Sequence, residues 1–479
     1  MSTTDTTCIV RFDRDLRLTD HPALVHAAER ADALLPVYVR TAPDTDWPPN
    51  DNQLHWRARS LRELADRLDD HDLPFAVLDG PPADSLPPLA DQIDADAVYW
   101  NRRYRPDARR RGDEAADRLR EAGVEVERYE ATLMHDPDAV ETTSGGPYHV
   151  YTPFWNKFRD VVDVSEPLPE PDLDAVSAPG GYTPDTGPDA LAPAADPAAA
   201  FDDWWTPGAR SARTQLDDFL ADVGAAYDEQ RDQLGVDGTS RLSPRFRHGE
   251  LSPRQVWHAT ERTTPDGEAP DDVHGTFRQE LVWREFSYHL LHHYPETATE
   301  PLKEKFRDFR WRRNPTLLQR WREGRTGYPI VDAGMRQLRR TGWMHNRARM
   351  IVASFLTKDL RLHWRHGAET FWEHLVDADL ANNTMGWQWA AGTGADAQPF
   401  FRIFNPVSQG ERHDPNGEYV RRWVPELSEL DDDVLHAPWK ADASDLREAG
   451  VELDDDYPAP IVDHADEREA SLAEWERIK

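Results

Sequence analysis

The spacing of apolar and polar residues differs between the first third of this chain and its second half. In the first third, short apolar runs predict β-strands at residues 7–10, 33–39, 74–78, 97–100 and 124–129. Amphipathic stretches between these runs predict helices at residues 22–31, 54–68 and 108–122. Strands that alternate with helices are typical of a Rossmann-like parallel sheet covered by helices, which we assign to residues 1–135.

In the second half of the chain, the apolar positions recur with the period of a helix. Residues 165–207 are rich in Pro, Ala, Asp and Gly and show little apolar periodicity, which is typical of a long linker. Beyond them, a helical period predicts helices at residues 209–220, 253–260, 277–292, 316–323, 330–341 and 345–359. We therefore predict a fold of mixed class, α/β plus all-α, with an α/β domain (1–135), a linker (136–206) and a helical domain (207–479).

The composition fits a protein with two cores and no membrane anchor. A chain of 479 residues is too long for one ordinary core. It contains no apolar run near the ~20 residues that a spanning helix needs, and its first residues lack the features of a signal peptide, so we expect a cytoplasmic protein. The single cysteine, Cys8, excludes an internal disulfide and a cysteine-rich zinc site, and we expect no metal site.

Charged residues are distributed unevenly along the chain. The chain has 89 acidic and 56 basic residues and a formal net charge of -33 at pH 7. Such a field repels nucleic-acid phosphates and is typical of a halophile-type solubility surface, with an acidic partner-binding role as the alternative. Residues 277–366, however, contain 19 basic and 9 acidic residues. This basic stretch is the candidate nucleic-acid face.

Two stretches of the helical domain allow both a structural and a functional interpretation. Residues 239–244 form a hydroxyl-rich turn before a helix, which suits either a bound phosphate or simple helix capping. Glu280, Trp283 and Arg284 share one helix face. They form either an intrahelical Glu280–Arg284 pair beside a packed indole, or a carboxylate and an aromatic ring presented together to a planar ligand.

Two carboxylates near a pair of tryptophans form a third candidate. Asp377 and Asp379 lack the further carboxylates of a calcium loop and the His or Cys ligands of a zinc site. An arginine partner such as Arg349 is the favoured interpretation. The glycine-containing run at residues 392–397 follows no predicted strand, so we discard it as a dinucleotide motif.

These stretches resemble those of the DNA photolyase/cryptochrome family, and most closely the class I cyclobutane pyrimidine dimer photolyases. Further matching motifs are RDLRL at 14–18, YTPFW at 151–155, GYPIVD at 327–332 and FNP at 404–406. The resemblance covers nearly the whole chain apart from the linker and is strongest from residue 227 to about residue 460. It implies an N-terminal antenna domain and a helical domain that binds FAD in a folded, U-shaped conformation.

The resemblance also implies roles for individual residues at the flavin. Asn383 matches the residue that faces the flavin N5, and Phe277 stands where tryptophan is common, which keeps an aromatic wall but loses an N–H donor. The implied FAD-binding residues are Tyr227, Thr239, Ser240, Arg241, Leu242, Ser243, Phe277, Asn346, Arg349, Asp377, Ala378, Asp379 and Asn383.

A chain of tryptophans and a lesion pocket complete the resemblance. Trp387, Trp364 and Trp311 match the family's electron-transfer chain, although core packing is the ordinary role of any single tryptophan. Asn346 and Met350 stand where (6-4) photolyases use a histidine pair, which favours cyclobutane dimers as the lesion. The implied DNA-binding residues are Arg231, Glu280, Trp283, Arg284, Asn346, Arg347, Met350, Trp389 and Gln409.

The implied activity is light-driven repair of cyclobutane pyrimidine dimers. An electron passes from photoexcited reduced FAD to the flipped-out dimer and then returns, with Glu280, Asn383 and the three tryptophans as the catalytic set. The implied partner is UV-damaged DNA, and we expect a monomer. The alternatives are a cryptochrome-type blue-light photoreceptor without repair activity and, more distantly, a light-independent flavin protein.

An antenna pigment is the least determined part of the resemblance. Asp107 and Ala108 replace the Asn-Glu pair that is expected of folate-binding members. Arg247 stands near the basic residue of deazaflavin-binding members. We therefore favour a deazaflavin over a folate, with the absence of any antenna as the alternative.

Overall fold

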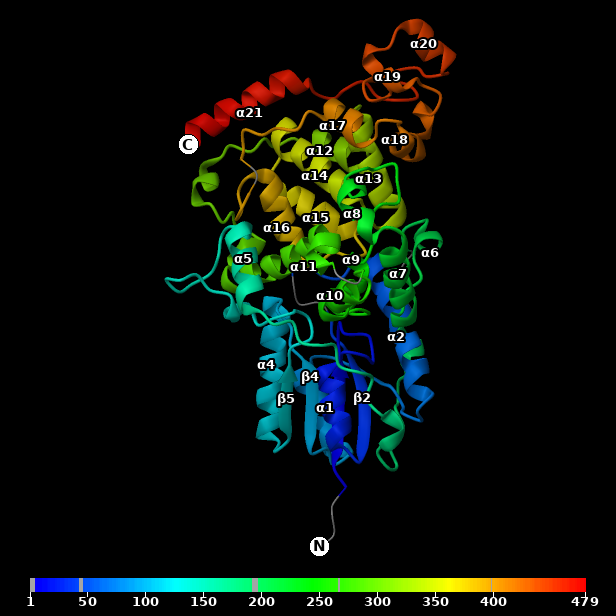
Figure 1. The fold of residues 1–479 in the computed structure, drawn as a ribbon, viewed down its shortest axis with the longest axis vertical. Helices are drawn as coiled ribbons and strands as arrows, with labels where there is room; N and C mark the ends of the chain where they lie inside the picture. The colour runs from blue at the N-terminus through cyan, green and yellow to red at the C-terminus, as the bar shows by residue number, and fades with distance from the viewer. Residues whose placement is uncertain (1–4, 43–45, 192–196, 266–267, 398) are drawn as a thin grey trace.

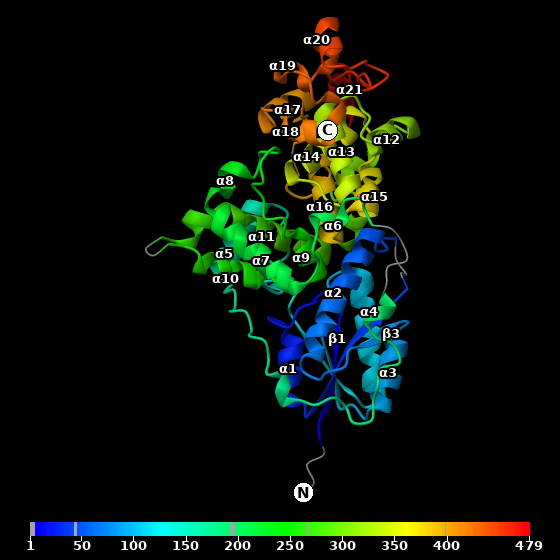
Figure 2. The same cartoon turned by 90° about the vertical axis from the view of Figure 1, so that its right-hand side faces the viewer.

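The computed structural model describes residues 5–42, 46–191, 197–265, 268–397 and 399–479. They form a lower α/β part, blue to cyan in Figure 1, and a larger helical part above it that carries the C-terminus. The turned view in Figure 2 shows helices α5, α7, α10 and α11 projecting to one side of the helical part. Within the described residues, no helix is both long and apolar enough to span a membrane.

The α/β part contains one parallel sheet in the order β3-β2-β1-β4-β5. Its strands are β1 (Thr7–Phe12), β2 (Ala33–Arg40), β3 (Ala76–Asp79), β4 (Ala97–Asn101) and β5 (Glu125–Tyr129). Side chains alternate between the two faces, so Val10 and Phe12 lie in one apolar cluster and Ile9 in the other. The predicted strand–helix alternation is confirmed.

Two pairs of helices cover the two faces of the sheet. Helices α1 (Pro22–Arg30) and α2 (Asp51–Asp69) pack on the face of Val10, and α3 (Pro82–Gln92) and α4 (Pro106–Glu121) pack on the face of Ile9. Helix α3 was not predicted. It contains Pro87 and Pro88, which remove backbone donors and normally argue against a helix, but burial of Leu86 and Leu89 holds it on the sheet.

Besides smaller apolar clusters around Trp205 and Phe306, the helical part is built on two large ones. One joins α5 (Tyr151–Val161), α7 (Ala209–Asp222), α10 (Pro253–Arg262) and α11 (Pro270–His293). The other joins α12 (Pro315–Arg322), α13 (Pro329–Thr341), α14 (Asn346–Ser354), α15 (Trp364–His374), α16 (Leu380–Ala391) and α18 (Glu418–Trp423). The other α-helices among the described residues are α6 (Phe201–Trp204), α8 (Tyr227–Gln230), α9 (Ser243–His248), α17 (Pro406–His413), α19 (Asp432–Leu435), α20 (Ala443–Glu448) and α21 (His464–Ile478).

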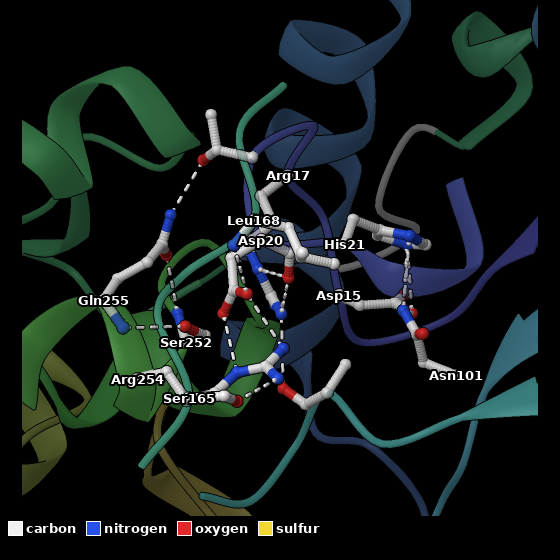
Figure 3. Close-up of polar contacts among 12 residues, drawn as sticks. Asp15, Arg17, Asp20, His21, Asn101, Ser165, Leu168, Ser252, Arg254 and Gln255 are labelled. Atoms are coloured by element: carbon white, nitrogen blue, oxygen red, sulfur yellow. Dashed lines mark hydrogen bonds and ion pairs between the residues drawn. The ribbon is translucent and has the colours of Figure 1, made fainter. Parts of the chain in front are cut away.

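A buried polar network joins the two parts and the connecting segment (Figure 3). The Arg17 guanidinium donates to the carbonyl oxygens of Asp20, Ala131 and Gly249, at 2.8–3.2 Å. The Asp20 carboxylate pairs with Arg254 of α10 at 2.8 Å and accepts from the backbone N–H of Leu168 at 3.1 Å. The network therefore fixes how the α/β part sits against the helical part.

Gly249 lets the two parts approach closely at this network. Its φ is +70°, in the left-handed region that favours glycine, and a Cβ there would lie 2.0 Å from the Arg14 carbonyl oxygen. The backbone of the RDLRL motif thus rests directly on the turn that follows α9.

A buried lysine beneath the C-terminal helix predicts an unusual dependence of stability on pH. The Lys358 side chain donates to the Arg402 carbonyl at 3.3 Å, and its backbone carbonyl accepts from Ser471 of α21. Burial lowers the pKa of Lys358 to about 7, although the neighbouring Asp359 carboxylate acts in the opposite direction. Between about pH 7 and the usual lysine pKa of 10.5, the unfolded chain therefore binds more protons than the folded protein.

We expect Lys358 to make the free energy of unfolding rise with pH in this range, by at most about 1.4 kcal/mol per pH unit. A Lys358→Met variant should lose that rise, because methionine does not titrate. Urea unfolding of both proteins at pH 6, 8 and 9.5 measures the difference. Parallel curves of unfolding free energy against pH would show that Lys358 is charged in the folded protein.

Candidate flavin and DNA site

A cavity of about 150 Å³ lies beside the hydroxyl-rich turn. Thr239 and Arg241 line it from the turn, Trp343 and His345 from the segment before α14, and Tyr419 from α18. The turn is held at this place by a hydrogen bond from the Trp343 indole to the Ser243 hydroxyl at 3.3 Å. The structure thus brings together segments about 100 and 180 residues apart around one polar hollow.

Arg241 is held rigidly at the cavity. Its φ of +50° lies in the left-handed region, and its guanidinium lies 4.7 Å from the Trp204 ring centre and 5.8 Å from that of Trp343. An ion pair of 2.9 Å to Asp237 fixes its far end. A guanidinium fixed by two indoles and a carboxylate is a preorganised site for an anionic group.

His345 adds a neutral hydrogen-bond donor to the same cavity. Its Nδ1 accepts from the backbone N–H of Arg347 at 3.1 Å, so the ring proton belongs on Nε2. Burial lowers the pKa of His345 to about 3, which keeps the imidazole uncharged at neutral pH. Sequence reasoning gave His345 no role, because a lone histidine beside a helix start carries no signal of its own.

A second group of polar residues precedes α16. Arg349 pairs with Asp377 at 2.8 Å, as expected from the sequence, and also donates to the Met344 carbonyl. Asp379 caps α16 by accepting from the backbone N–H of Asn382 at 3.1 Å and accepts from the Tyr288 hydroxyl at 2.7 Å.

Several buried polar atoms around these segments have no hydrogen-bond partner within the described part of the chain. Among them are Arg241 Nε, His345 Nε2, Asp377 Oδ1 and Trp387 Nε1. Buried polar groups are rarely left unpaired in folded proteins, so several in one region indicate a missing polar ligand. A large ligand with phosphate, ribose and heteroaromatic groups, such as FAD, fits this mixture of cationic, neutral and anionic groups.

The remaining implied flavin residues surround this region. Asn383 is buried and donates to the Ala368 carbonyl at 3.0 Å, which fixes its amide against α15. Phe277 packs on Tyr227 at 5.3 Å between ring centres, forming an aromatic wall. The Ser240 backbone carbonyl accepts a hydrogen bond from the Gln215 side-chain amide at 2.8 Å. Leu242 and Ala378 are buried, and Asn346 is exposed.

The three tryptophans lie along α15 and α16 and in the segment before α12. Trp387 and Trp364 are buried, whereas Trp311 is partly exposed. The His363 ring lies between the last two, 5.3 Å from Trp311 and 5.6 Å from Trp364. The order from a buried indole to a partly exposed one is the order that electron supply from the surface requires.

The implied DNA residues are partly or fully exposed, and Glu280 and Trp283 share one surface of α11. Glu280 pairs with Arg231 at 2.8 Å, and Trp283 stacks on Tyr151 at 3.6 Å with rings 8° from parallel. The intrahelical Glu280–Arg284 pair is not formed. Met350, Trp389 and Gln409 are partly buried on α14, α16 and α17, and Arg347 is tied to Asp232.

Arg284 lies apart from this surface. Its guanidinium pairs with the fully buried Glu285 at 2.9 Å and lies 4.8 Å from the Tyr288 ring centre. The helical spacing of Glu280 and Arg284 would allow them to pair. The Arg284 guanidinium instead contacts Glu285 and Tyr288, which the spacing does not predict. Tyr151, which supports Trp283, belongs to the matching motif at 151–155, but no role of its own was predicted for it and it falls in the predicted linker.

A second cavity, of about 240 Å³, lies between the α/β part and the end of α11. Trp100, Tyr104, Ala108, Arg109 and His292 are among its lining residues. Asp107 is held by Arg105 and Arg111, at 2.6 and 3.0 Å.

Arg247 lies elsewhere. Its guanidinium is buried, donates to the Ala378 carbonyl and lines a separate small hollow together with Arg103 and Tyr288.

Two family models of known proteins match separate parts of this chain. Residues 8–172 match the family model for DNA photolyase, and residues 277–477 match that for the FAD binding domain of DNA photolyase. The deoxyribodipyrimidine photo-lyase of Agrobacterium fabrum is 43% identical over 474 residues, which are 98% of each chain. The chain belongs to the DNA photolyase family.

Solved structures of photolyase-family members share the complete fold. A bacterial class III photolyase from Agrobacterium tumefaciens is 42% identical, with a TM-score of 0.93 over 100% of this chain and 98% of its own. A cryptochrome from Synechocystis is 29% identical, with a TM-score of 0.89 over 99% and 100% of the two chains.

The predicted family, the two-part fold and the FAD-binding domain are confirmed. The class I relationship is not supported, because the 42% identical photolyase is of class III. The sequence motifs used for the prediction belong to the family as a whole and do not separate its classes.

Proposed function

We propose that this photolyase repairs cyclobutane pyrimidine dimers in DNA with blue light. The observation that carries the proposal is the full-length similarity to a deoxyribodipyrimidine photo-lyase, together with a helical part that matches the family's FAD-binding domain. The cavity beside Thr239 and the unpaired polar atoms near it support FAD as the resident cofactor.

When bound, FAD would supply light-driven one-electron chemistry, which protein side chains do not provide. Arg241 and His345 would hold its anionic groups, because one carries a fixed charge and the other a neutral N–H. Asp377 and Asn383, fixed by Arg349 and by the Ala368 carbonyl, would orient the ring system. The buried tryptophan chain would resupply electrons from the surface.

The lesion would enter over the surface of Glu280 and Trp283. A dimer must leave the duplex to reach a buried cofactor, and this costs least where damaged bases stack poorly. Trp283, held flat by Tyr151, offers an apolar wall for the pyrimidine rings. Glu280, held by Arg231, would form a hydrogen bond to the dimer and stabilise the charge that develops on it.

The class of the enzyme is proposed from similarity. We propose class III rather than class I, since the 42% identical structure is of that class. A cryptochrome-type photoreceptor is the second candidate, supported by the 0.89 TM-score to the Synechocystis cryptochrome. The Glu280–Arg231 and Trp283–Tyr151 contacts at the lesion surface favour repair.

An antenna pigment would occupy the 240 Å³ cavity between the two parts. Its aromatic and arginine lining suits a planar anionic pigment. A deazaflavin remains the favoured pigment. Asp107 and Ala108 replace the Asn-Glu pair expected of folate-binding members, and the Asp107 carboxylate is already paired with Arg105 and Arg111. Arg247 does not line this cavity itself, but it lines a hollow that shares Arg103 with it, so its basic side chain remains compatible with this choice.

The central experiment follows dimers in light and in darkness. Purified FAD-loaded protein is chemically reduced, mixed with dimer-containing DNA and divided between blue light and darkness. We expect dimers to disappear only in the light. Persistence of dimers in the light, with a flavin that still photoreduces, would instead establish a photoreceptor.

A Glu280→Ala variant is expected to repair about 10-fold or more slowly, because a hydrogen bond to a charged group contributes about 1.5–3 kcal/mol. The readout is the initial rate of dimer loss at saturating DNA. Glu304→Ala is the control, since Glu304 is 84% exposed. Equal rates for Glu280→Ala and the wild type would remove Glu280 from the catalytic set.

A further inference from the structure

Two adjacent histidines and an aspartate meet at the junction of the two parts. His292 and His293 end α11, and Asp138 lies in the short helix Pro137–Ala139 that follows the sheet. Asp138 Oδ1 lies 3.1 Å from His292 Nε2 and 3.8 Å from His293 Nε2. One donor atom from each of the three residues lies within 4.8 Å of both others.

Neighbouring histidines of the same helix face are already used inside the protein. His289 contacts the Pro137 carbonyl through Nδ1 at 3.2 Å, and its Nε2 accepts from the backbone N–H of Tyr148 at 3.0 Å. The Nε2 of His293, in contrast, is buried and has no hydrogen-bond partner among the residues that the structure describes. An unpaired buried nitrogen that points toward a carboxylate and a second imidazole requires an explanation.

We propose that Asp138, His292 and His293 bind a late first-row divalent cation, with Zn²⁺ as the best fit. Two imidazoles and a carboxylate form a donor set that Zn²⁺ accepts, with a fourth position left for water. Zinc–ligand bonds of 2.0–2.1 Å place tetrahedral donors about 3.4 Å apart. The observed 3.1 and 3.8 Å bracket that separation, so small side-chain rotations complete the geometry.

The surroundings allow a cation to enter. Asp138 is 64% exposed, whereas His292 and His293 are 16% and 17% exposed, so the site opens to solvent on the aspartate side. Arg102, one of the arginines that line the same cavity, is partly neutralised by Glu130 at 3.0 Å. A bound ion would tie the segment after the sheet to the end of α11, and its role would be to stabilise the junction.

The sequence predicted no metal site because Asp138 and the histidines are about 150 residues apart. Neither of the two segments alone contains the spacing of a metal motif. The proposal is independent of FAD binding and of repair, since none of the three residues belongs to the flavin or lesion surfaces. Asp138 and His292 do line the 240 Å³ cavity proposed for an antenna pigment, so the ion would lie beside that pigment.

The test measures Zn²⁺ binding to the FAD-loaded protein by titration calorimetry, in buffer with millimolar Mg²⁺ to occupy sites made only of oxygen ligands. We expect one stoichiometric site in the wild type and its loss in a His292→Ala/His293→Ala variant. The matched control is His26→Ala, which removes an exposed histidine paired with a single carboxylate, Glu29. FAD content and circular dichroism confirm that the variants fold.

Two results would overturn the proposal. One is equal Zn²⁺ binding by the double variant, which would assign the ions to the acidic surface. The other is no stoichiometric site in the wild type. As an independent readout, Cu²⁺ bound to the wild type should show imidazole nitrogen coupling in its electron paramagnetic resonance spectrum, and Asp138→Asn should weaken Zn²⁺ binding while keeping that coupling.

Discussion

A methyl group added at Gly367 is expected to displace the indole of Trp387 and to remove most flavin photoreduction. A Cβ at this position of α15 would lie 2.0, 2.2 and 2.6 Å from Cη2, Cζ3 and Cζ2 of Trp387. The indole cannot retreat easily, because Phe371 and Trp321 pack on it at 4.9 and 6.0 Å between ring centres. Because the interior is closely packed, the added methyl group can be accommodated only if the Trp387 ring moves.

The expected cost in stability for Gly367→Ala is about 1–3 kcal/mol, which is typical of overpacking. Photoreduction of the oxidised flavin should slow strongly, and the excited-state lifetime of the flavin should lengthen, since the proposed nearest electron donor has moved. Repair by chemically reduced enzyme should remain, because that reaction does not draw electrons through Trp387. Time-resolved flavin fluorescence and dimer loss measure the two effects separately.

Matched variants separate the ring movement from a general loss of structure. Gly386→Ala lies one residue from Trp387 in α16 and meets nothing within 4 Å, so it should leave photoreduction unchanged. A Gly367→Ala/Trp387→Phe variant replaces the indole by a smaller ring and should recover stability without recovering photoreduction. Photoreduction of Gly367→Ala at the wild-type rate would show that Trp387 is not the first donor.

The contact between Gly367 and Trp387 illustrates what sequence patterns leave out. Local periodicity was sufficient for the strands of the sheet, because each buried strand is a short apolar run such as the one around Ile9. It failed for α3, where tertiary burial of Leu86 outweighed two prolines. In the linker region it missed α5, whose Tyr151 supports Trp283.

Site residues could be predicted where they belong to a sequence motif. Their contacts could not be predicted where the partner comes from a segment brought close only by tertiary packing. Asp377 and Arg349 were expected to pair and do so at 2.8 Å. Glu280, in contrast, pairs with Arg231 from a distant segment instead of Arg284, one helical turn away. His345 became a candidate only when its cavity and its hydrogen bond to the Arg347 backbone were known.

Removing Arg254 is expected to cause a large loss of stability, because it leaves a buried carboxylate without its main partner. Asp20 is 0% exposed and Arg254 is 10% exposed, and two contacts of 2.8 and 3.2 Å join them (Figure 3). In Arg254→Met the Asp20 carboxylate keeps the backbone N–H of Leu168, while the neighbouring Arg17 is directed at carbonyl oxygens. Breaking such a buried pair costs about 3–5 kcal/mol.

A double-mutant cycle distinguishes the lost pair from lost packing. Asp20→Asn/Arg254→Met removes both charges and should recover much of the loss, since the buried carboxylate is then absent. Arg213→Met is the control, because its pair with Asp217 is 49% and 56% exposed and should contribute less than about 1 kcal/mol. Urea unfolding at fixed salt gives the four free energies, and a double variant less stable than Arg254→Met would show that Asp20 has another partner. The expected recovery would instead show that the junction in Figure 3 is held by this pair, so that the α/β part depends on the helical part for its position.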